Sequence, residues 1–159
     1  PDYKLEQGYT IKAIDELQNF INAYTKSTRI PEANKLIDEL RLKLETKAFD
    51  EAMLYFNLKE YQSATITLNN MLKDFPDSHN AEKIRYFIVK SNYTLAENSV
   101  YSKKLERYET TLIAAELYLN KFSKTKDRRE VDGILKSTKQ IIKNLEKDGY
   151  KDKSTRDRS

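Results

Sequence analysis

Side chains that could perform acid, base or nucleophilic chemistry are scarce in this 159-residue sequence. It contains one histidine, His79, and no cysteine. Hydrolysis and group transfer usually need a base beside a nucleophile, or a cluster of metal ligands. His79 directly follows the turn-forming residues 76–78, so we interpret it as a solvated residue near a helix start. The sequence therefore argues against an enzyme and predicts no catalytic, cofactor or metal site.

Paired carboxylates do not change that interpretation. Asp15/Glu16, Asp38/Glu39 and Asp50/Glu51 lie in lysine-rich segments that we expect to be helical. Neighbouring residues on a helix point about 100° apart, so such pairs do not converge on a substrate. With three glycines in the whole chain, a glycine-rich phosphate loop is also excluded. These acids are best explained as solvated helix faces.

A basic cluster is the strongest candidate for a polar contact surface. Its members are Lys121, Lys124, Lys126, Arg128 and Arg129, and they are partly offset by Asp127 and Glu130. The cluster flanks a predicted turn, where it could simply be solvated. An acidic protein partner is the alternative, followed by lipid head groups or nucleic acid.

Tyrosine is abundant, with 11 copies, and most of them fit a predicted core. Tyr3, Tyr101 and Tyr150 fall outside the apolar stripes described below. Exposed aromatic side chains are enriched at protein contacts. Tyr101 is therefore the second candidate for partner contact.

The composition favours a folded, helical chain. Hydrophobic residues make up 38% and charged residues 34%, but the 11 Tyr and 6 Phe are interleaved with aliphatic residues at regular intervals. Three Gly and three Pro are too few for many short strands, which favours long helices with short connections. We expect an all-α fold.

The net charge and the first residue of the sequence say little about where in the cell the protein is located. Lys and Arg (29) exceed Asp and Glu (25) by a small margin that is spread along the chain, which does not by itself imply nucleic acid. No window approaches 18 uncharged apolar residues, so we expect neither a membrane span nor a signal peptide. The sequence starts at Pro1 rather than Met, so we expect a fragment, and any upstream anchor or targeting signal would lie outside it.

An internal repeat organises the sequence. Residues 13–27, 64–78 and 111–125 align with shifts of 51 and 47 residues. The equivalent apolar positions are spaced 3, 1 and 3, which is one face of a helix. They are Leu17, Leu68 and Ala115; Phe20, Met71 and Tyr118; Ile21, Leu72 and Leu119; and Tyr24, Phe75 and Phe122.

The same register continues beyond the polar turn that ends each copy. It pairs Ala33, Ile84 and Val131, so the repeated unit is predicted to be helix, tight turn, helix. Such units stack because one alone cannot bury its apolar face. We predict a right-handed α-solenoid domain over residues 1–146, with units at about 9–44, 45–96 and 105–146, and a charged flexible tail over 147–159.

Details of the elements follow from the same pattern. Pro31 to Leu58 is predicted to form one helix of about 28 residues, roughly 40 Å long, with a break near Glu45 to Lys47 as the alternative. Glu97 to Arg107 looks like an insertion and is predicted to be a loop. Asp127 and Glu130 have the spacing of a capping box.

Residues 52–76, AMLYFNLKEYQSATITLNNMLKDFP, resemble the tetratricopeptide pattern. The matching positions are Ala52, Tyr55, Leu58, Tyr61, Ala64, Leu68 and Pro76. The two alanines would let antiparallel helices approach closely, and Pro76 would stop the second helix. Lys59 stands where the pattern has Gly, so the turn must either avoid a left-handed conformation or tolerate strain.

Over about residues 5–145 the chain resembles the carboxy-terminal repeats of the BamD family, particularly the versions of Bacteroidetes-type bacteria. These are tetratricopeptide lipoproteins of the outer-membrane β-barrel assembly machinery. The segments that carry the resemblance are residues 13–49, 57–78 and 88–111. The resemblance implies a lipid-anchored protein on the periplasmic side of the outer membrane that docks to the BamA periplasmic domains and helps to deliver unfolded barrel proteins.

The sequence therefore predicts a non-catalytic scaffold for protein–protein interaction within that machinery. A tetratricopeptide adaptor of the periplasm or cytosol, unrelated to barrel assembly, is the first alternative. A weak nucleic-acid binder that uses the basic excess is the second, and its affinity would fall steeply with salt.

Overall fold

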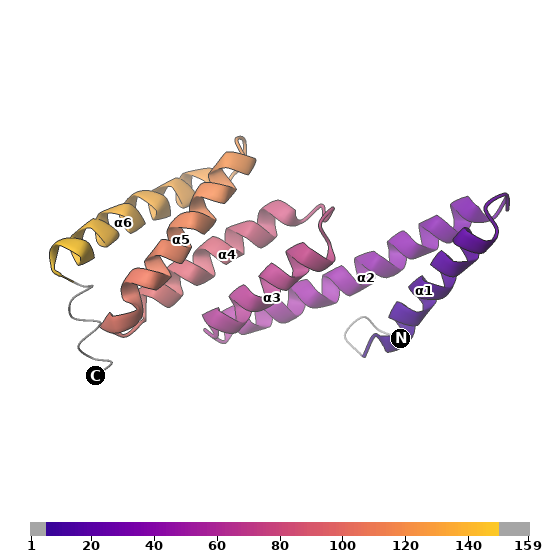
Figure 1. Ribbon diagram of the computed structural model, residues 1–159, viewed down its shortest axis with the longest axis horizontal. Helices are drawn as coiled ribbons and strands as arrows, with labels where there is room; N and C mark the ends of the chain where they lie inside the picture. Colours follow the sequence, from indigo (N-terminus) through magenta and orange to yellow (C-terminus); the bar gives the residue numbers. More distant parts are fainter. Residues whose placement is uncertain (1–5, 150–159) are drawn as a thin grey trace. The chain divides into compact units, whose positions relative to one another are not determined.

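The computed structural model describes residues 6–149, and this part of the chain consists of helices and their connections, without strands (Figure 1). The helices are α1 (Gly8–Ala23), α2 (Ile30–Asn57), α3 (Tyr61–Asp74), α4 (Ala81–Glu97), α5 (Tyr101–Lys121) and α6 (Arg128–Lys147). The prediction of an all-α, tetratricopeptide-like fold is confirmed. The right-handed sense of the solenoid stays a prediction.

The chain divides into two compact units, Pro1–Glu51 and Ala52–Ser159. The first contains α1 and most of α2, and the second contains the end of α2 and helices α3 to α6. The division of residues 1–146 into three repeat units of one domain stays a prediction.

The three copies of the repeat close in the same way. Helices α1, α3 and α5 end at positions that are 51 and 47 residues apart, and the helices that follow them begin at positions with the same separations. The first residue after each helix donates its backbone N–H to the carbonyl four residues earlier, at 2.8–2.9 Å; these residues are Tyr24, Phe75 and Phe122. The repeat seen in the sequence is therefore confirmed in the local structure.

In the first unit, the apolar stripe of α2 supplies the buried residues Ala33 and Ile37. At the start of α1, Thr10 Oγ1 donates a hydrogen bond to Gln7 Oε1 at 2.6 Å. Further along α1, the rings of Phe20 and Tyr24 are 5.3 Å apart. This unit is thus a helix pair whose buried face is narrow.

In the second unit, the end of α2 packs against α3 and α4. Ala52 and Ala64 are completely buried, as expected if small side chains allow close approach of helices. The Phe56 ring meets Tyr61 at 5.5 Å and Phe87 at 5.2 Å, both edge to face. Aromatic side chains therefore connect the end of α2 with α3 and α4.

Helices α4, α5 and α6 share two buried clusters. Near one end lie Val89, Ala115, Tyr118 and Val131, and near the other lie Ala96, Leu105, Tyr108 and Leu145. Every helix of the three contributes to both clusters. The core that α4, α5 and α6 form therefore consists of two buried clusters at different positions along the helices.

The long helix was predicted correctly. Helix α2 covers Ile30–Asn57 as 28 residues without interruption, so the alternative break at Glu45 to Lys47 is wrong. The tail predicted for residues 147–159 overlaps α6 at one residue, Lys147, with which the helix ends. Residues 150–159 and Tyr3 lie outside the described residues.

The loop predicted for Glu97 to Arg107 is wrong. Helix α4 continues to Glu97 and α5 begins at Tyr101, so residues 98–100 form the connection. The added residues lengthen α5 because Leu105 and Tyr108 continue its apolar stripe and are 5% and 3% exposed. The segment also contains no Gly or Pro to stop a helix.

Lys59 adopts the left-handed conformation that the tetratricopeptide pattern reserves for glycine, with φ of 64°. It closes α2 in a Schellman arrangement. The Glu60 N–H donates to the Tyr55 carbonyl at 2.9 Å, and the Lys59 N–H donates to the Phe56 carbonyl at 3.1 Å. The turn therefore tolerates strain rather than avoiding the left-handed region.

We predict that Lys59→Gly stabilises the protein by about 0.5–1 kcal/mol. A left-handed residue with a Cβ costs about 1–2 kcal/mol, and the greater freedom of glycine in the unfolded chain offsets part of this gain. Urea denaturation followed by circular dichroism measures the change. Lys59→Ala is the control and should remain within about 0.5 kcal/mol of the parent protein; equal stabilisation by both variants would contradict the conformational explanation.

The predicted capping box at Asp127 and Glu130 is also wrong. The Asp127 side chain makes no cap hydrogen bond. The Glu130 carboxylate instead reaches α4, where it accepts a hydrogen bond from Tyr86 at 2.8 Å and pairs with Lys90 at 3.1 Å. The hydrogen bond from Tyr86 is the main cause that lowers the pKa of Glu130, and Lys90 lowers it further.

Because the folded state lowers the pKa of Glu130, its contribution to stability is complete above the unfolded value near 4.5 and is lost as the pH falls through the folded value. We predict that Glu130→Gln lowers stability at pH 7 by no more than about 1 kcal/mol, since the two side chains are partly exposed, at 33% and 48%. The variant should also lose less stability than the parent between about pH 5 and pH 3. Glu109→Gln, on an exposed part of α5, is the control, and pH-dependent urea denaturation is the measurement.

Candidate partner-binding groove

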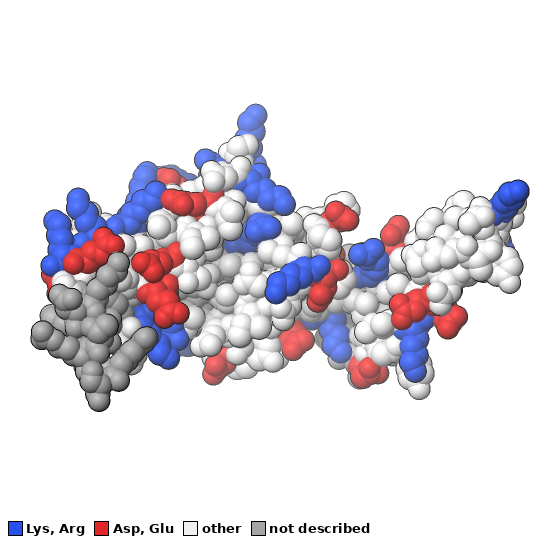
Figure 2. Space-filling model, in the orientation of Figure 1, with Lys and Arg blue, Asp and Glu red and all other residues white. Residues whose placement is uncertain are grey.

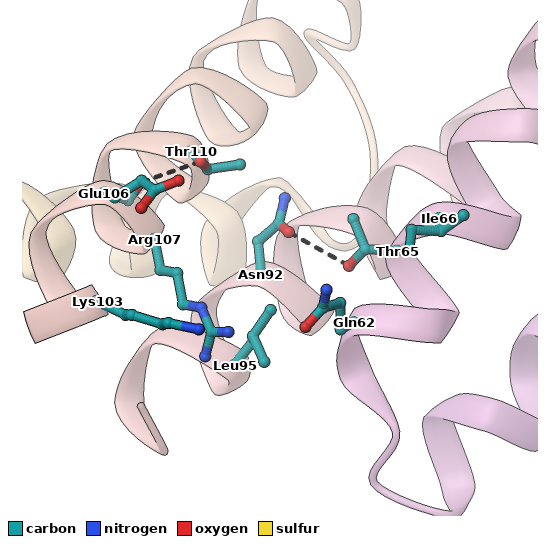
Figure 3. A pocket seen from close by; sticks show the side chains of 9 residues that line it. All are labelled: Gln62, Thr65, Ile66, Asn92, Leu95, Lys103, Glu106, Arg107 and Thr110. Atoms are coloured by element: carbon teal, nitrogen blue, oxygen red, sulfur yellow. Dashed lines mark hydrogen bonds between the residues drawn. The ribbon is translucent and has the colours of Figure 1, made fainter. Parts of the chain in front are cut away.

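Helices α3, α4 and α5 enclose an open cavity of about 360 Å³ in the second unit (Figure 3). Helix α4 forms its floor, and α3 and α5 form its walls. The lining residues are Gln62, Thr65, Ile66, Asn92, Leu95, Lys103, Glu106, Arg107 and Thr110. None of them belongs to the contact surface predicted from the sequence.

A second hollow of about 220 Å³ adjoins the first and shares Thr65, Asn92 and Thr110 with it. It extends the cavity along the same helices and adds Asn69, Arg85, Ile88, Ile113, Ala114 and Leu117 to the lining. We call the two hollows together the α3–α5 groove. It is long enough to contact several residues of a ligand.

Asn92 lies at the centre of the groove. Its side chain is buried, at 5% exposure, and its Oδ1 accepts a hydrogen bond from Thr65 Oγ1 at 3.2 Å. This bond links the floor to the α3 wall and turns the amide nitrogen away from Thr65 (Figure 3). The amide can thus donate to a ligand.

Cations outnumber acids in the groove. Arg85, Lys103 and Arg107 line it together with a single carboxylate, Glu106. Arg107 Nη1 donates a hydrogen bond to Ser99 Oγ at 2.5 Å, which holds the guanidinium near the connection between α4 and α5. The groove therefore favours an anionic group.

Apolar side chains stand along the walls. Ile66 on α3 is 55% exposed, and Ile113 and Leu117 on α5 are 59% and 53% exposed. Isolated exposed aliphatic residues are ordinary, but these three border one groove. A partner could bury them together.

The predicted basic cluster lies at the turn between α5 and α6, and Figure 2 shows basic side chains projecting there. Lys121, Lys124, Lys126 and Arg129 are exposed. The Lys121 Nζ atom is 6.0 Å from the centre of the Phe122 ring. These four side chains are available to a partner, although the structure does not bring them into the groove.

Arg128 is used within the turn itself. Its Nη1 donates hydrogen bonds to the carbonyls of Leu119 at 2.7 Å and Phe122 at 2.8 Å. Both carbonyls belong to the end of α5, where the helix leaves its last acceptors unpaired. Arg128 therefore fastens the start of α6 to the end of α5.

Tyr118 braces the same turn from inside. Its hydroxyl donates to the Glu82 carboxylate and lies 2.8 Å from Thr125 Oγ1. Burial, and then the hydrogen bond with Glu82, raise the pKa of Tyr118 to about 12. The tyrosine is thus a neutral donor at physiological pH and a structural residue, as its place on the apolar stripe indicated.

The two remaining residues singled out from the sequence, Tyr101 and His79, lie outside the groove lining. Tyr101 is the first residue of α5 and is 43% exposed, but it does not line the groove. His79 is exposed in the turn before α4. Sequence reasoning missed Asn92, although an asparagine between Ile88 and Leu95 at helical spacing is a polar interruption of an apolar stripe and could have indicated it.

Residues 6–149 contain neither a cluster of metal ligands nor a helix that could span a membrane. No group of three or more His, Cys, Asp or Glu side chains is arranged there to hold a metal ion. No helix in that range combines the length and apolar character needed to cross a membrane.

Stacked antiparallel helix pairs with small residues at their contacts define this protein as a tetratricopeptide-like repeat protein. A family model described as outer membrane lipoprotein, YfiO, matches residues 2–108. The chain belongs to this family, the BamD family, as its sequence resemblance indicated. No curated protein matches the chain.

Family membership locates the protein at the outer membrane as a lipoprotein on the periplasmic side. It also associates the protein with the assembly of outer-membrane proteins, in a family without catalytic activity.

We predict that Arg128→Ala destabilises the protein by about 1–3 kcal/mol, because it removes two charge-assisted hydrogen bonds to carbonyls at the end of α5. Arg129→Ala, which changes the exposed neighbour, should cost no more than about 0.5 kcal/mol. Urea denaturation of both variants gives the comparison. Equal losses of stability would show that the hydrogen bonds of Arg128 contribute nothing beyond its charge.

Proposed function

We propose that this chain is a non-catalytic scaffold that binds other subunits of the outer-membrane β-barrel assembly complex, and that its principal partner is the periplasmic domains of BamA. Unfolded outer-membrane proteins are proposed as transient second ligands. The observation that carries this proposal is the α3–α5 groove, which is open and bordered by exposed apolar side chains.

Three features support an interaction role. The exposed aliphatic residues of the groove would lose contact with water on binding, which favours association. The buried clusters of α4, α5 and α6 hold the floor and the α5 wall of the groove in shape before a partner arrives. Family membership supplies the complex in which such a surface would be used.

We keep the basic cluster as a second proposed contact. Lys121, Lys124, Lys126 and Arg129 project from one turn, and Tyr101 offers an exposed ring at the start of α5. Charges at the rim of an interface chiefly raise the rate of association and its dependence on salt. We therefore propose that the cluster guides an acidic partner surface rather than providing most of the affinity.

The test is binding of the full chain to the purified periplasmic domains of BamA from the same organism, measured by isothermal titration calorimetry. We expect a one-to-one complex that survives 150 mM salt. Leu117→Asp combined with Ile113→Asp should weaken it at least tenfold, because both changes place a charge on the α5 wall. Leu54→Asp, at an exposed leucine outside the groove lining, is the matched control.

The outcomes separate the possible functions. If neither the chain nor the intact lipoprotein in detergent binds any BamA periplasmic domain, the proposed partner is wrong. Binding that is unaffected by the groove variants would assign BamA to another surface. An affinity for single-stranded DNA that falls steeply with salt would favour nucleic-acid binding instead.

A further inference from the structure

The groove floor contains an amide donor that no protein group uses. Asn92 Oδ1 accepts a hydrogen bond from Thr65, but among the described residues no acceptor is hydrogen-bonded to Asn92 Nδ2, which points into the cavity (Figure 3). The nitrogen is open to the groove, because it is not among the buried side-chain atoms that lack a partner. An acceptor on a ligand would replace water at this donor and would orient the ligand.

The acceptor that a polypeptide offers most regularly is its backbone carbonyl. In an α-helix these carbonyls are bonded internally, except for those of the last turn. In an extended segment they remain available along the whole length. The position of Asn92 in the middle of the floor, with hollows on both sides, therefore favours an extended peptide over a helix.

Charge specifies one side chain of that peptide. Lys103 and Arg107 are one helical turn apart on α5 and line the same hollow, and no ion pair with a carboxylate is formed by either of them among residues 6–149. Arg85 Nε at the other end of the groove is buried and has no hydrogen-bond partner in that range. With Glu106 as the single acid of the lining, a carboxylate is the complementary group.

The walls specify the neighbouring side chains. Ile66 on α3 and Ile113 and Leu117 on α5 line the groove, and all three are more than half exposed. Apolar side chains on either side of the carboxylate could cover them. Successive side chains of an extended segment alternate in direction. A segment whose carboxylate lies against Lys103 and Arg107 can therefore direct apolar side chains to Ile66 on the opposite wall and to Ile113 and Leu117 further along α5.

We propose that the α3–α5 groove binds an extended internal segment of a partner protein in which an Asp or Glu side chain is flanked by apolar residues. The carboxylate lies against Lys103 and Arg107, a backbone carbonyl accepts from Asn92 Nδ2, and the apolar side chains cover the wall residues. This inference rests on the proposed interaction role and specifies the ligand of the same groove.

The first experiment selects eight-residue peptides, displayed internally on phage, for binding to the full chain. We expect enrichment of peptides with one Asp or Glu next to apolar residues. Their affinities are then measured by fluorescence polarisation, with both peptide ends blocked. Enrichment of basic peptides, or of none, would overturn the proposal, as would binding that requires a free C-terminal carboxylate.

The second experiment changes the groove. Lys103→Glu with Arg107→Glu should weaken the selected peptides at least tenfold, and replacing the peptide acid by its amide should have a similar effect on the parent protein. Asn92→Leu should also weaken binding, independently of the peptide acid. Lys143→Glu with Lys147→Glu, the same charge change at the same spacing on exposed α6, should leave the affinity within about twofold of the parent.

Circular dichroism tests whether each variant is folded, and the single variant Lys103→Glu is the folding control. This residue lies in the first turn of α5, where an acidic side chain is favourable for the helix, so lost binding cannot be assigned to unfolding. Equal weakening by the groove and control pairs would overturn the proposal.

The same variants are tested against the BamA periplasmic domains. If the groove variants bind the BamA periplasmic domains as tightly as the parent protein does, the proposed groove ligand is wrong and the proposed function remains in place. Specific peptide binding without BamA binding would refute the partner while supporting the groove ligand.

Discussion

Close packing of α4 against its neighbours is the constraint on which the second unit depends. Helix α4 contacts α3, α5 and α6, so its buried positions must be small or must match their surroundings. Ser91, Ala96, Thr111, Ala115 and Thr138 are completely buried on α4, α5 and α6, and such side chains allow helix backbones to approach. The face of α4 left between α3 and α5 then becomes the floor of the groove. The candidate site is therefore a product of the packing and needs no loop of its own.

The helices could be predicted from the sequence because their apolar residues recur at helical spacing and their turns repeat. Ala33, Ile84 and Val131 were aligned from the sequence and are all buried. The inserted segment before Tyr108 was misjudged because its added length was treated as a loop, whereas Leu105 extended the apolar stripe. Glu130 was misjudged because local spacing resembled a cap, while its actual partners lie on α4, 40 or more residues earlier. Such contacts are decided by tertiary structure.

The groove was harder to predict than the helices. Its members come from three helices, and Arg107 is not unusual within its own segment. Asn92 interrupts an apolar stripe, but that interruption does not reveal which helices meet around it. The basic cluster attracted attention because its charges are adjacent in sequence, yet Arg128 is hydrogen-bonded to the end of α5. Density of charge along the chain says little about which groups converge in space. The converging set becomes visible only when α3 and α5 are placed on either side of α4.

The hydrogen bond between Thr65 and Asn92 has a further consequence. It crosses from one groove wall to the floor, and a ligand seated there would touch α3, α4 and α5 at once. Local opening of any of these helices would then require release of the ligand, so occupancy would raise the free energy of opening by an amount set by concentration and affinity. Occupied and empty protein would differ in amide hydrogen exchange along α3 even if their folds were identical. Binding of a ligand would thus be detectable as less frequent local opening of the helices that line the groove.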